Sequence, residues 1–312
     1  MDEKVVYILG AGASIDHSVG FFPDINSIFL KGVEKNIIKN PLLEYRELID
    51  YIKEKYAVDM TEGNVKINAE NVYTSIEITK EHDLEYGVIL EKQFQEFIIT
   101  LFDSLHKEKE AEIKSGSYSK LQKILRWTDT IITFNWDILL DNILDRKKII
   151  EEHIENKETI DMSIEQYIQY LQFFQDLSIY SVQIWEHVAP SPPNIKTEKF
   201  TKGTYLKLHG SIDWKVCPNE SCRAYGLICP VLGPLTEILC GECREKLSPL
   251  IIPPGLNKPI GKIFPVRRLW NFAIDEIHNA EIIIIWGYSY PPTDFYADWL
   301  FREGRKSKNL KE

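Results

Sequence analysis

The stretch Lys4–Ser14, KVVYILGAGAS, carries the strongest indication of the fold. Its apolar, β-branched run stops at two glycines, which is typical of a buried strand entering a tight turn. Glycine lets the backbone turn sharply and bring its N–H groups close to a phosphate. We therefore predict a phosphate-binding turn made by Gly10, Ala11, Gly12 and Ser14. The alternative is a turn that only reverses the chain.

The turn departs from the fingerprint of nicotinamide dehydrogenases. That fingerprint has a third Gly or Ala where this chain has Ile15, and an acidic residue at the end of a second strand about 20 positions later. No clear strand of that kind follows, so hydride transfer is disfavoured.

Further apolar runs alternate with helical patterns along the chain. Strands are predicted at Asp129–Phe134, Thr204–Leu208, Pro249–Ile252 and Glu281–Trp286, and helices at Pro41–Tyr56, Glu85–Ile113, Ile138–Leu144, Ile164–Phe174, Val266–Asn279 and Thr293–Gly304. Alternation of this kind predicts an α/β fold, with a Rossmann-like parallel sheet and helices on both faces. We expect a single domain over residues 1–312, with a mostly helical insertion at 24–126 and a cysteine module at 215–247.

Composition limits the possible partners. Of the 312 residues 44% are hydrophobic, which allows a substantial core, and the net charge of −10 disfavours direct binding to nucleic acid. No apolar stretch approaches the roughly 20 residues of a membrane helix, and the N-terminus does not resemble a signal peptide. We therefore expect a cytoplasmic protein that does not associate with membranes.

Polar side chains follow two of the predicted strands. Asn135 and Asp137 come after the strand that ends at Phe134, and His209 comes after the strand that ends at Leu208. Ligands of open α/β sheets bind at the carboxyl ends of strands. An amide can orient a water or a ribose hydroxyl, a carboxylate can accept hydrogen bonds from a ribose diol, and a histidine can take a proton near neutral pH. Helix capping by Asn135 or Asp137, and a purely structural His209, are the alternatives.

Four of the five cysteines occur as pairs, Cys217/Cys222 and Cys240/Cys243, with 17 residues between the pairs. Paired thiolates on two turns suit a closed, structural zinc site with tetrahedral coordination. Cys229 is the remaining cysteine, and it is an alternative ligand to Cys222.

Taken together, these segments resemble the sirtuin superfamily, and more closely its bacterial sirtuin-like branch. Five segments carry the resemblance in addition to the paired cysteines: Gly10–Ser14 (GAGxS), Gly20–Asp24 (GFFPD, loosely), Thr133–Asp137 (TFNWD), His209-Gly210, and Gly287–Asp294 (GYSYPPTD). The chain differs from sirtuin deacylases in having Phe134 for a glutamine, in lacking an arginine after Asp24, and in having PLIIPPGL at Pro249–Leu256 instead of a Phe-Gly-Glu segment.

The resemblance implies an enzyme that cleaves the nicotinamide–ribose bond of NAD, with Asn135 and His209 as the catalytic pair. It implies NAD binding by Gly10, Ala11, Gly12, Ser14, Asp137, Gly287, Ser289 and Asp294, and structural zinc on Cys217, Cys222, Cys240 and Cys243. The branch implies an NAD⁺ glycohydrolase of antiphage defence that acts as a homo-oligomer or with a partner protein of the defence system. The alternatives are an NAD-dependent protein deacylase and a non-enzymatic domain that senses NAD or ADP-ribose.

A strand and helix at Glu281–Gly304 would normally be followed by another parallel strand in a doubly wound sheet. Arg305–Glu312, RKSKNLKE, is too polar for that strand. We therefore expect either a sheet that lacks a C-terminal strand or a chain that is one domain of a longer protein.

Overall fold

The computed structural model describes most of the segments that carry the predicted site. It covers residues 3–17, 44–60, 67–109, 116–126, 128–144, 204–225, 228–230, 239–240, 242–252, 258, 260–261, 263–290, 294–306 and 308–311. The helix predicted at Ile164–Phe174 and the Gly20–Asp24 segment lie outside these residues. Within them, every helix is too short or too polar to cross a bilayer.

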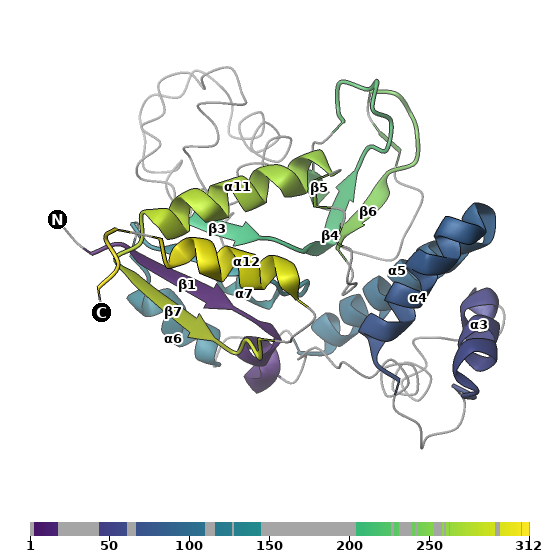
Figure 1. Ribbon diagram of the computed structural model, residues 1–312, viewed down its shortest axis with the longest axis horizontal. Coiled ribbons are helices and arrows are strands. Elements are labelled where there is room, and N and C mark those ends of the chain that lie inside the picture. Colours follow the sequence, from purple (N-terminus) through teal and green to yellow (C-terminus); the bar gives the residue numbers. More distant parts are fainter. Residues whose placement is uncertain are drawn as a thin grey trace.

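A parallel sheet forms the centre of the molecule (Figure 1). Its order is β3-β2-β1-β7, with β1 at Val5–Leu9, β2 at Thr130–Thr133, β3 at Thr204–Lys207 and β7 at Ile282–Trp286. All three pairings are parallel, and β1 is in register with both β2 and β7. The first strand is buried along its whole length, which explains its β-branched composition. The predicted parallel sheet is confirmed.

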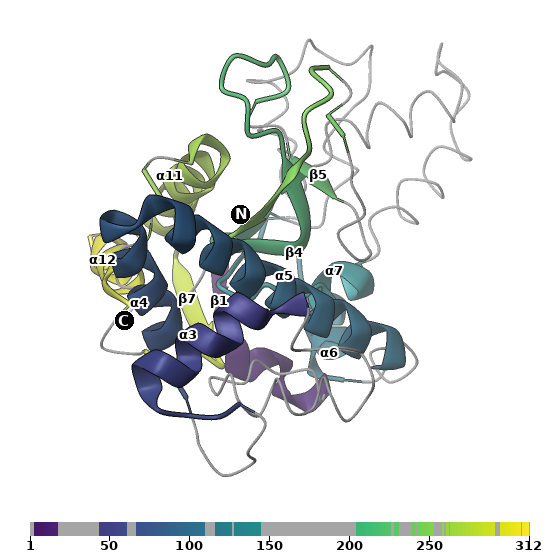
Figure 2. The same ribbon diagram turned by 90° about the vertical axis from the view of Figure 1, so that its right-hand side faces the viewer.

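Helices cover both faces of this sheet (Figures 1 and 2). On one face, α11 (Phe264–His278) packs against α12 (Phe295–Gly304); on the other, α6 (Ser117–Ile124) packs against α7 (Leu139–Leu144). The observed bounds of α7, α11 and α12 differ from the predicted ones by at most two residues at each end. The predicted arrangement of helices is therefore confirmed for these elements.

A helical module projects from the sheet domain. It consists of α3 (Arg46–Tyr56), α4 (Ala69–His82) and α5 (Leu84–Lys109), and α5 packs against both of the others. The described parts of residues 24–126 are thus mostly helical.

A second, antiparallel sheet was not predicted. Its order is β5-β4-β6, with β4 at Gly210–Val216, β5 at Ile228–Pro230 and β6 at Ser248–Ile251. The strand predicted at Pro249–Ile252 exists as β6, but it pairs with β4 rather than joining the parallel sheet. Gly210 makes this pairing possible, because its φ is +75° and a Cβ there would lie 2.1 Å from the Leu250 carbonyl oxygen.

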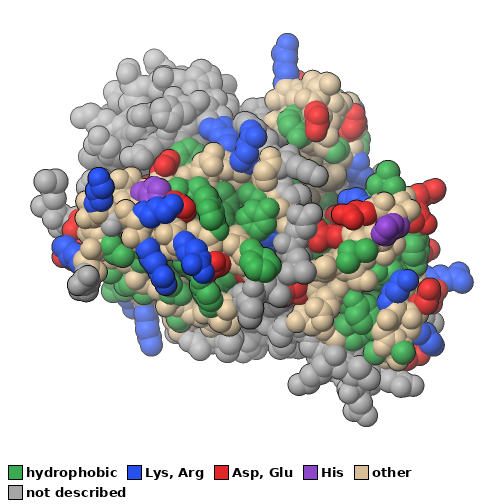
Figure 3. All heavy atoms as spheres, viewed as in Figure 1, with side chains coloured by type: hydrophobic (Ala, Val, Ile, Leu, Met, Phe, Trp, Pro, Cys, Tyr) green, Lys and Arg blue, Asp and Glu red, His purple; other side chains and the backbone are tan. Residues whose placement is uncertain are grey.

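The strand β7 lies at one edge of the described parallel sheet. Ile284 and Ile285 are exposed on it, and Phe295 and Trp299 are exposed on α12. Apolar and basic side chains lie together on the face that carries α11 and α12 (Figure 3). Near the start of β7 the Lys311 N–H donates to the Glu281 carbonyl at 2.9 Å.

Candidate functional site

The glycine turn packs directly against the loop that follows β7. It leads into the 3₁₀ helix η1 (Ala11–His17). The Gly10 N–H donates to the Trp286 carbonyl at 3.0 Å, and the Gly12 N–H donates to the Gly287 carbonyl at 2.7 Å. A Cβ on Gly12 would lie 2.8 Å from the Gly287 Cα. The two glycines therefore permit contact between two backbones, which is a packing role beyond chain reversal.

Gly287 completes this contact from the opposite side. Its φ of +67° lies in the left-handed region, and a Cβ would lie 2.0 Å from the Ala13 nitrogen. Because Gly10, Gly12 and Ala13 all donate to backbone carbonyls, the Ala11 N–H is the amide of this turn without a backbone acceptor among the described residues. An anion at the start of η1 would meet that amide first.

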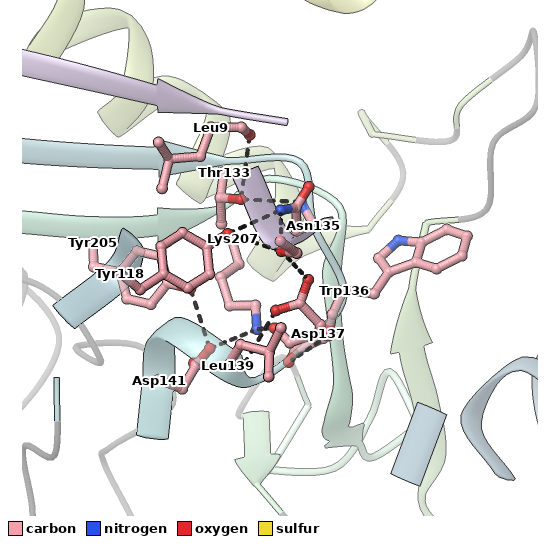
Figure 4. A network of polar contacts seen from close by, with 12 residues as sticks. Leu9, Tyr118, Thr133, Asn135, Trp136, Asp137, Leu139, Asp141, Tyr205 and Lys207 are labelled. Carbon is pink, nitrogen blue, oxygen red and sulfur yellow. Dashed lines mark hydrogen bonds and ion pairs between the residues drawn. The ribbon is translucent and has the colours of Figure 1, made fainter. Parts of the chain in front are cut away.

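Asn135 lies at the centre of a buried polar network behind the turn (Figure 4). Its Nδ2 donates to the Gly10 carbonyl at 2.9 Å and to the Ser14 Oγ at 3.1 Å. Ser14 donates to Asp137 Oδ2 at 2.7 Å, and its Oγ lies 2.8 Å from the Tyr118 hydroxyl. These contacts hold the amide in one orientation and leave its Oδ1 without a hydrogen bond to the described residues.

Asp137 also caps a helix. Its Oδ1 accepts from the Leu139 N–H, the first amide of α7, at 3.1 Å, so the capping role considered for this residue is observed. The other carboxylate oxygen of Asp137 accepts from the Ser14 hydroxyl, and the side chain is buried. Asp137 therefore holds Ser14 in place within the network.

An ion pair between the buried Lys207 and the partly buried Asp141 links the start of α7 to β3. The Lys207 Nζ lies 3.0 Å from Asp141 Oδ2 and donates to the Asp137 carbonyl at 2.6 Å (Figure 4). The Tyr205 hydroxyl also donates to Asp141. This contact fixes the segment that carries Asp137, because a charged pair in the interior tolerates little displacement.

His209 lies just beyond β3 and is buried among aromatic rings. Its ring centroid is 5.1 Å from that of Phe134 and 6.4 Å from that of Trp270. Burial first, and then the nearby Lys258 charge, lower the pKa of His209 to about 3, against opposing effects of Asp294 and a hydrogen bond to the Phe134 backbone. The imidazole is therefore neutral at neutral pH. Its Nε2 is buried and has no hydrogen-bond partner among the described residues.

Phe134 connects the two groups of polar residues. It precedes Asn135 in the chain, and its ring contacts both His209 and Tyr288, the latter at a centroid distance of 5.0 Å. The side chain that replaces the glutamine of the resembling motif thus fills the space beside the histidine. Asn135 and His209 are both placed at the carboxyl edge of the parallel sheet, where open α/β folds bind ligands.

Of the other predicted NAD-binding residues, Asp294 is buried beside Tyr288, whereas Ser289 is exposed and makes no hydrogen bond within the described part of the chain. Three residues of the site were missed from sequence: Tyr118, Lys207 and Lys258. A lysine within the apolar run TYLKL is a usable signal, because a charge in a buried strand requires a partner. Tyr118 and Lys258 occupy stretches with no such anomaly.

The four predicted cysteines come together in the second sheet region. The Sγ atoms of Cys217, Cys222, Cys240 and Cys243 all lie within 4.8 Å of one another. The separation is 3.5 Å between Cys217 and Cys243 and 3.8 Å between Cys222 and Cys240. A tetrahedral ion with Zn–S bonds of ~2.3 Å places its sulfurs about 3.8 Å apart, so these residues fit zinc.

The backbone around these thiols also suits a metal. The Ala224 N–H points at the Cys222 sulfur at 3.3 Å, and the backbone N–H groups of Cys243 and Glu242 lower the pKa of the Cys240 thiol to about 7, against the effect of burial. The thiolate of Cys240 is thereby favoured, whereas burial raises the pKa of the Cys217 thiol to about 12. The side chain of Cys229, the alternative ligand, lies outside what the structure describes.

The fold and the site define an α/β protein with a doubly wound parallel sheet, a helical module and a four-cysteine cluster that fits zinc. No protein-family model matches the chain, and no curated protein is significantly similar to it.

Solved structures of Sir2 homologues are similar over most of the chain. One is a triple mutant in complex with 2′-O-acetyl ADP ribose, with a TM-score of 0.35, 14% identity, and coverage of 97% of this chain and 76% of that chain. Another is a Sir2 homologue in complex with NAD, with a TM-score of 0.35, 13% identity, and coverage of 96% and 75%. Because both TM-scores are 0.35 and the identities are 14% and 13%, these similarities do not assign a function, which has to be argued from the site residues themselves.

Proposed function

We propose that this chain is an NAD⁺ glycohydrolase, which converts NAD⁺ and water to ADP-ribose and nicotinamide. The observation that carries the proposal is that Asn135 and His209, which can orient a water and accept a proton, both lie at the carboxyl edge of the parallel sheet. Asn135 presents a fixed amide whose Oδ1 is hydrogen-bonded to none of the described residues, and His209 presents a neutral ring whose Nε2 likewise has no partner among them. The resemblance of the surrounding motifs to sirtuin-like proteins supports the choice of NAD as the substrate.

In the proposed reaction the bond between ribose C1′ and the nicotinamide nitrogen breaks, and its electron pair leaves with neutral nicotinamide. A water oxygen then forms the new bond to C1′. Asn135 orients the water or a ribose hydroxyl through Oδ1, and the neutral His209 accepts a proton through Nε2 before releasing it to solvent. A neutral imidazole has the free lone pair that this role requires, while its lowered pKa makes the ring a weak base that passes the proton on readily to solvent.

The test measures nicotinamide released from NAD by the purified chain, or by its full-length parent. His209→Ala and Asn135→Ala should each lose most of the activity while retaining the parent's circular dichroism. His82→Ala is the matched control, because His82 is exposed at the end of α4, outside the site. If both site variants turn over NAD like the parent, the catalytic assignment is wrong.

The same assay separates the two alternatives. Release of nicotinamide only when an acetylated peptide is present would identify a deacylase. Tight NAD binding without turnover, under every activating condition tried, would identify a sensor domain. The absence of a Phe-Gly-Glu segment at Pro249–Leu256 supports hydrolysis over deacylation.

We further propose that the reaction depletes NAD in the cytoplasm of infected bacteria, together with a second copy or a partner protein. This proposal follows from the motif resemblance. Cells that express the parent should lose NAD after phage infection, whereas cells that express His209→Ala should keep it. An equal fall in NAD in both strains would refute the defence role.

A further inference from the structure

The strand β7 is an edge strand with one open side. Among the described residues it pairs with β1 alone (Figure 1), and two of its side chains, Ile284 and Ile285, are 41% and 52% exposed. These side chains point to opposite faces of the sheet, because successive side chains alternate along a strand. The strand at the other edge, β3, is almost wholly buried. Exposure of this kind is therefore not shared by the two edges of the sheet.

The register of the sheet shows which backbone groups of β7 point outward. The Trp286 carbonyl accepts from the Gly10 N–H, so the backbone groups of Trp286 point toward β1. Because this direction alternates from one residue to the next, the N–H and C=O groups of Ile283 and Ile285 point away from β1. Within the described part of the chain these outward groups have no backbone partner.

The sequence of β7 has none of the features that usually discourage pairing at an edge. Edge strands of soluble proteins commonly carry a lysine, a proline or a bulge. The strand β7 reads IIIIW, and it stays in register with β1 along its whole length. The backbone of Lys311 bonds to Glu281, the residue before the strand, and so covers only its start. The rest of β7 is a regular, apolar edge.

A second copy of β7 fits this edge when it runs antiparallel about a two-fold axis at Ile284. Ile283 then faces Ile285 of the second copy, and Ile285 faces Ile283 of the second copy. Each of these pairs can exchange two hydrogen bonds, so all the outward groups are matched. Ile284 meets its own counterpart in a non-hydrogen-bonded pair, the kind in which side chains lie closest.

The charges on α12 are complementary under the same symmetry. The helix lies beside β7, since a Cβ on Gly304 would lie 3.4 Å from Ile283 Cδ1. Its first turn carries Asp298, whereas Arg302 lies in its last turn and Arg305 caps its end. A two-fold axis through β7 makes the two copies of α12 antiparallel. The acidic start of each helix then faces the basic end of the other.

We propose that a second copy of this chain docks on β7, and that the two antiparallel strands join the parallel sheets of both copies into one continuous sheet. A second copy is favoured over an unrelated strand because the hydrogen-bond pattern and the charges are each complementary to themselves, as an isologous interface requires. Burial of Ile284 and Ile285 adds a hydrophobic contribution. The inference is independent of the proposed reaction, and the carboxyl edges of the two sheets point in opposite directions.

The first test measures the mass of the purified chain, and of its full-length parent, by light scattering during gel filtration. We expect a dimer in both cases. Ile284→Lys places two like charges at the axis and should give a monomer whose circular dichroism matches the parent's. Ile78→Lys is the matched control, because Ile78 is 53% exposed on α4, away from β7, and this variant should remain a dimer.

Two results of this measurement would overturn the proposal. One is a monomeric parent, whether β7 then stays open or is covered by other residues of the same chain. The other is a dimer that Ile284→Lys leaves intact, since the copies would then meet through another surface.

Crosslinking tests the register, and it keeps the proposal falsifiable if Ile284→Lys fails to fold. Ile284→Cys brings two thiols together at the axis, where opposite Cβ atoms lie about 4.5–5.5 Å apart, close to the spacing of a disulfide. With oxidised glutathione as the oxidant, it should form a covalent dimer on a non-reducing gel. Mass spectrometry of the linked peptide separates this bond from bonds of the five native cysteines.

Ile285→Cys is the control for register. The side chain of Ile285 is the more exposed of the two, but in the proposed dimer it faces Ile283 of the second copy instead of its own counterpart. Ile285→Cys should therefore crosslink much less than Ile284→Cys. Equal crosslinking of the two variants, or none with Ile284→Cys, would refute the antiparallel pairing of β7.

Discussion

The lowered pKa of His209 predicts that the folded protein loses stability as the pH falls. In the unfolded chain this residue titrates near its ordinary pKa of 6.5, whereas in the folded protein its pKa is lowered to about 3. Between these values the unfolded state binds a proton that the folded state does not, so stability falls as the pH falls. The contribution is fully present above pH 6.5 and is lost progressively down to about pH 3.

The magnitude follows from linkage. Well inside this window one proton is worth about 1.4 kcal/mol per pH unit, so lowering the pH from the ordinary pKa to about 4.5 removes about 2 kcal/mol. Other groups with shifted pKa values also act over this range. His209→Gln isolates the histidine, because the variant keeps those groups and removes the titrating ring.

The assay is urea unfolding of the parent and of His209→Gln at a series of pH values. The difference in unfolding free energy between them should shrink by about 2 kcal/mol over this range, to the disadvantage of the parent. His82→Gln is the control, as it replaces a histidine outside the core. A difference between parent and His209→Gln that stays constant from neutral pH to about 4.5 would refute a neutral, buried His209.

Three further outcomes are expected. The chain should carry about one zinc ion, and Cys240→Ser should lose both the metal and stability, because a structural zinc contributes folding free energy; metal analysis that shows full retention would contradict the ligand set. Gly287→Ala should cost more than about 1 kcal/mol in urea unfolding, because its Cβ would lie 2.0 Å from the Ala13 nitrogen at a φ of +67°, whereas Gly261→Ala, with nothing within 4 Å of its Cβ, should change stability by less than about 0.5 kcal/mol. Tyr118→Phe should slow nicotinamide release with the fold intact, because it removes a hydroxyl that supports Asn135, and unchanged turnover would exclude that support.

The parallel sheet could be predicted because the sequence of each strand is by itself recognisable as a buried strand. Val5–Leu9 and Ile282–Trp286 are unbroken apolar runs, and each stops where a glycine allows the turn. The position of Asn135 and His209 at one sheet edge follows from the same rule, since parallel strands present their carboxyl ends together.

The second sheet could not be predicted in the same way. The strand β4 contains Asp213 and Lys215 within its span, so no apolar run marks it, and its pairing with β6 depends on Gly210 meeting the Leu250 backbone. Lys258 was missed for a related reason. Its partner Asp294 is distant in sequence, and nothing in a proline- and glycine-rich stretch reports a contact that only the fold creates.

The contact between the glycine turn and Gly287 has a consequence for protein engineering and for sequence searches. The backbones of Gly10 and Gly12 contact that of Gly287, so the place that a Cβ would take at any of the three is already occupied by another of them or by its chain neighbour. A library that varies one of these positions at a time samples only variants that clash. Distant relatives that lack one of these glycines should carry a compensating substitution in the segment that faces it. Covariation between the N-terminal turn and the segment around Gly287 should therefore detect relatives more sensitively than the N-terminal motif alone.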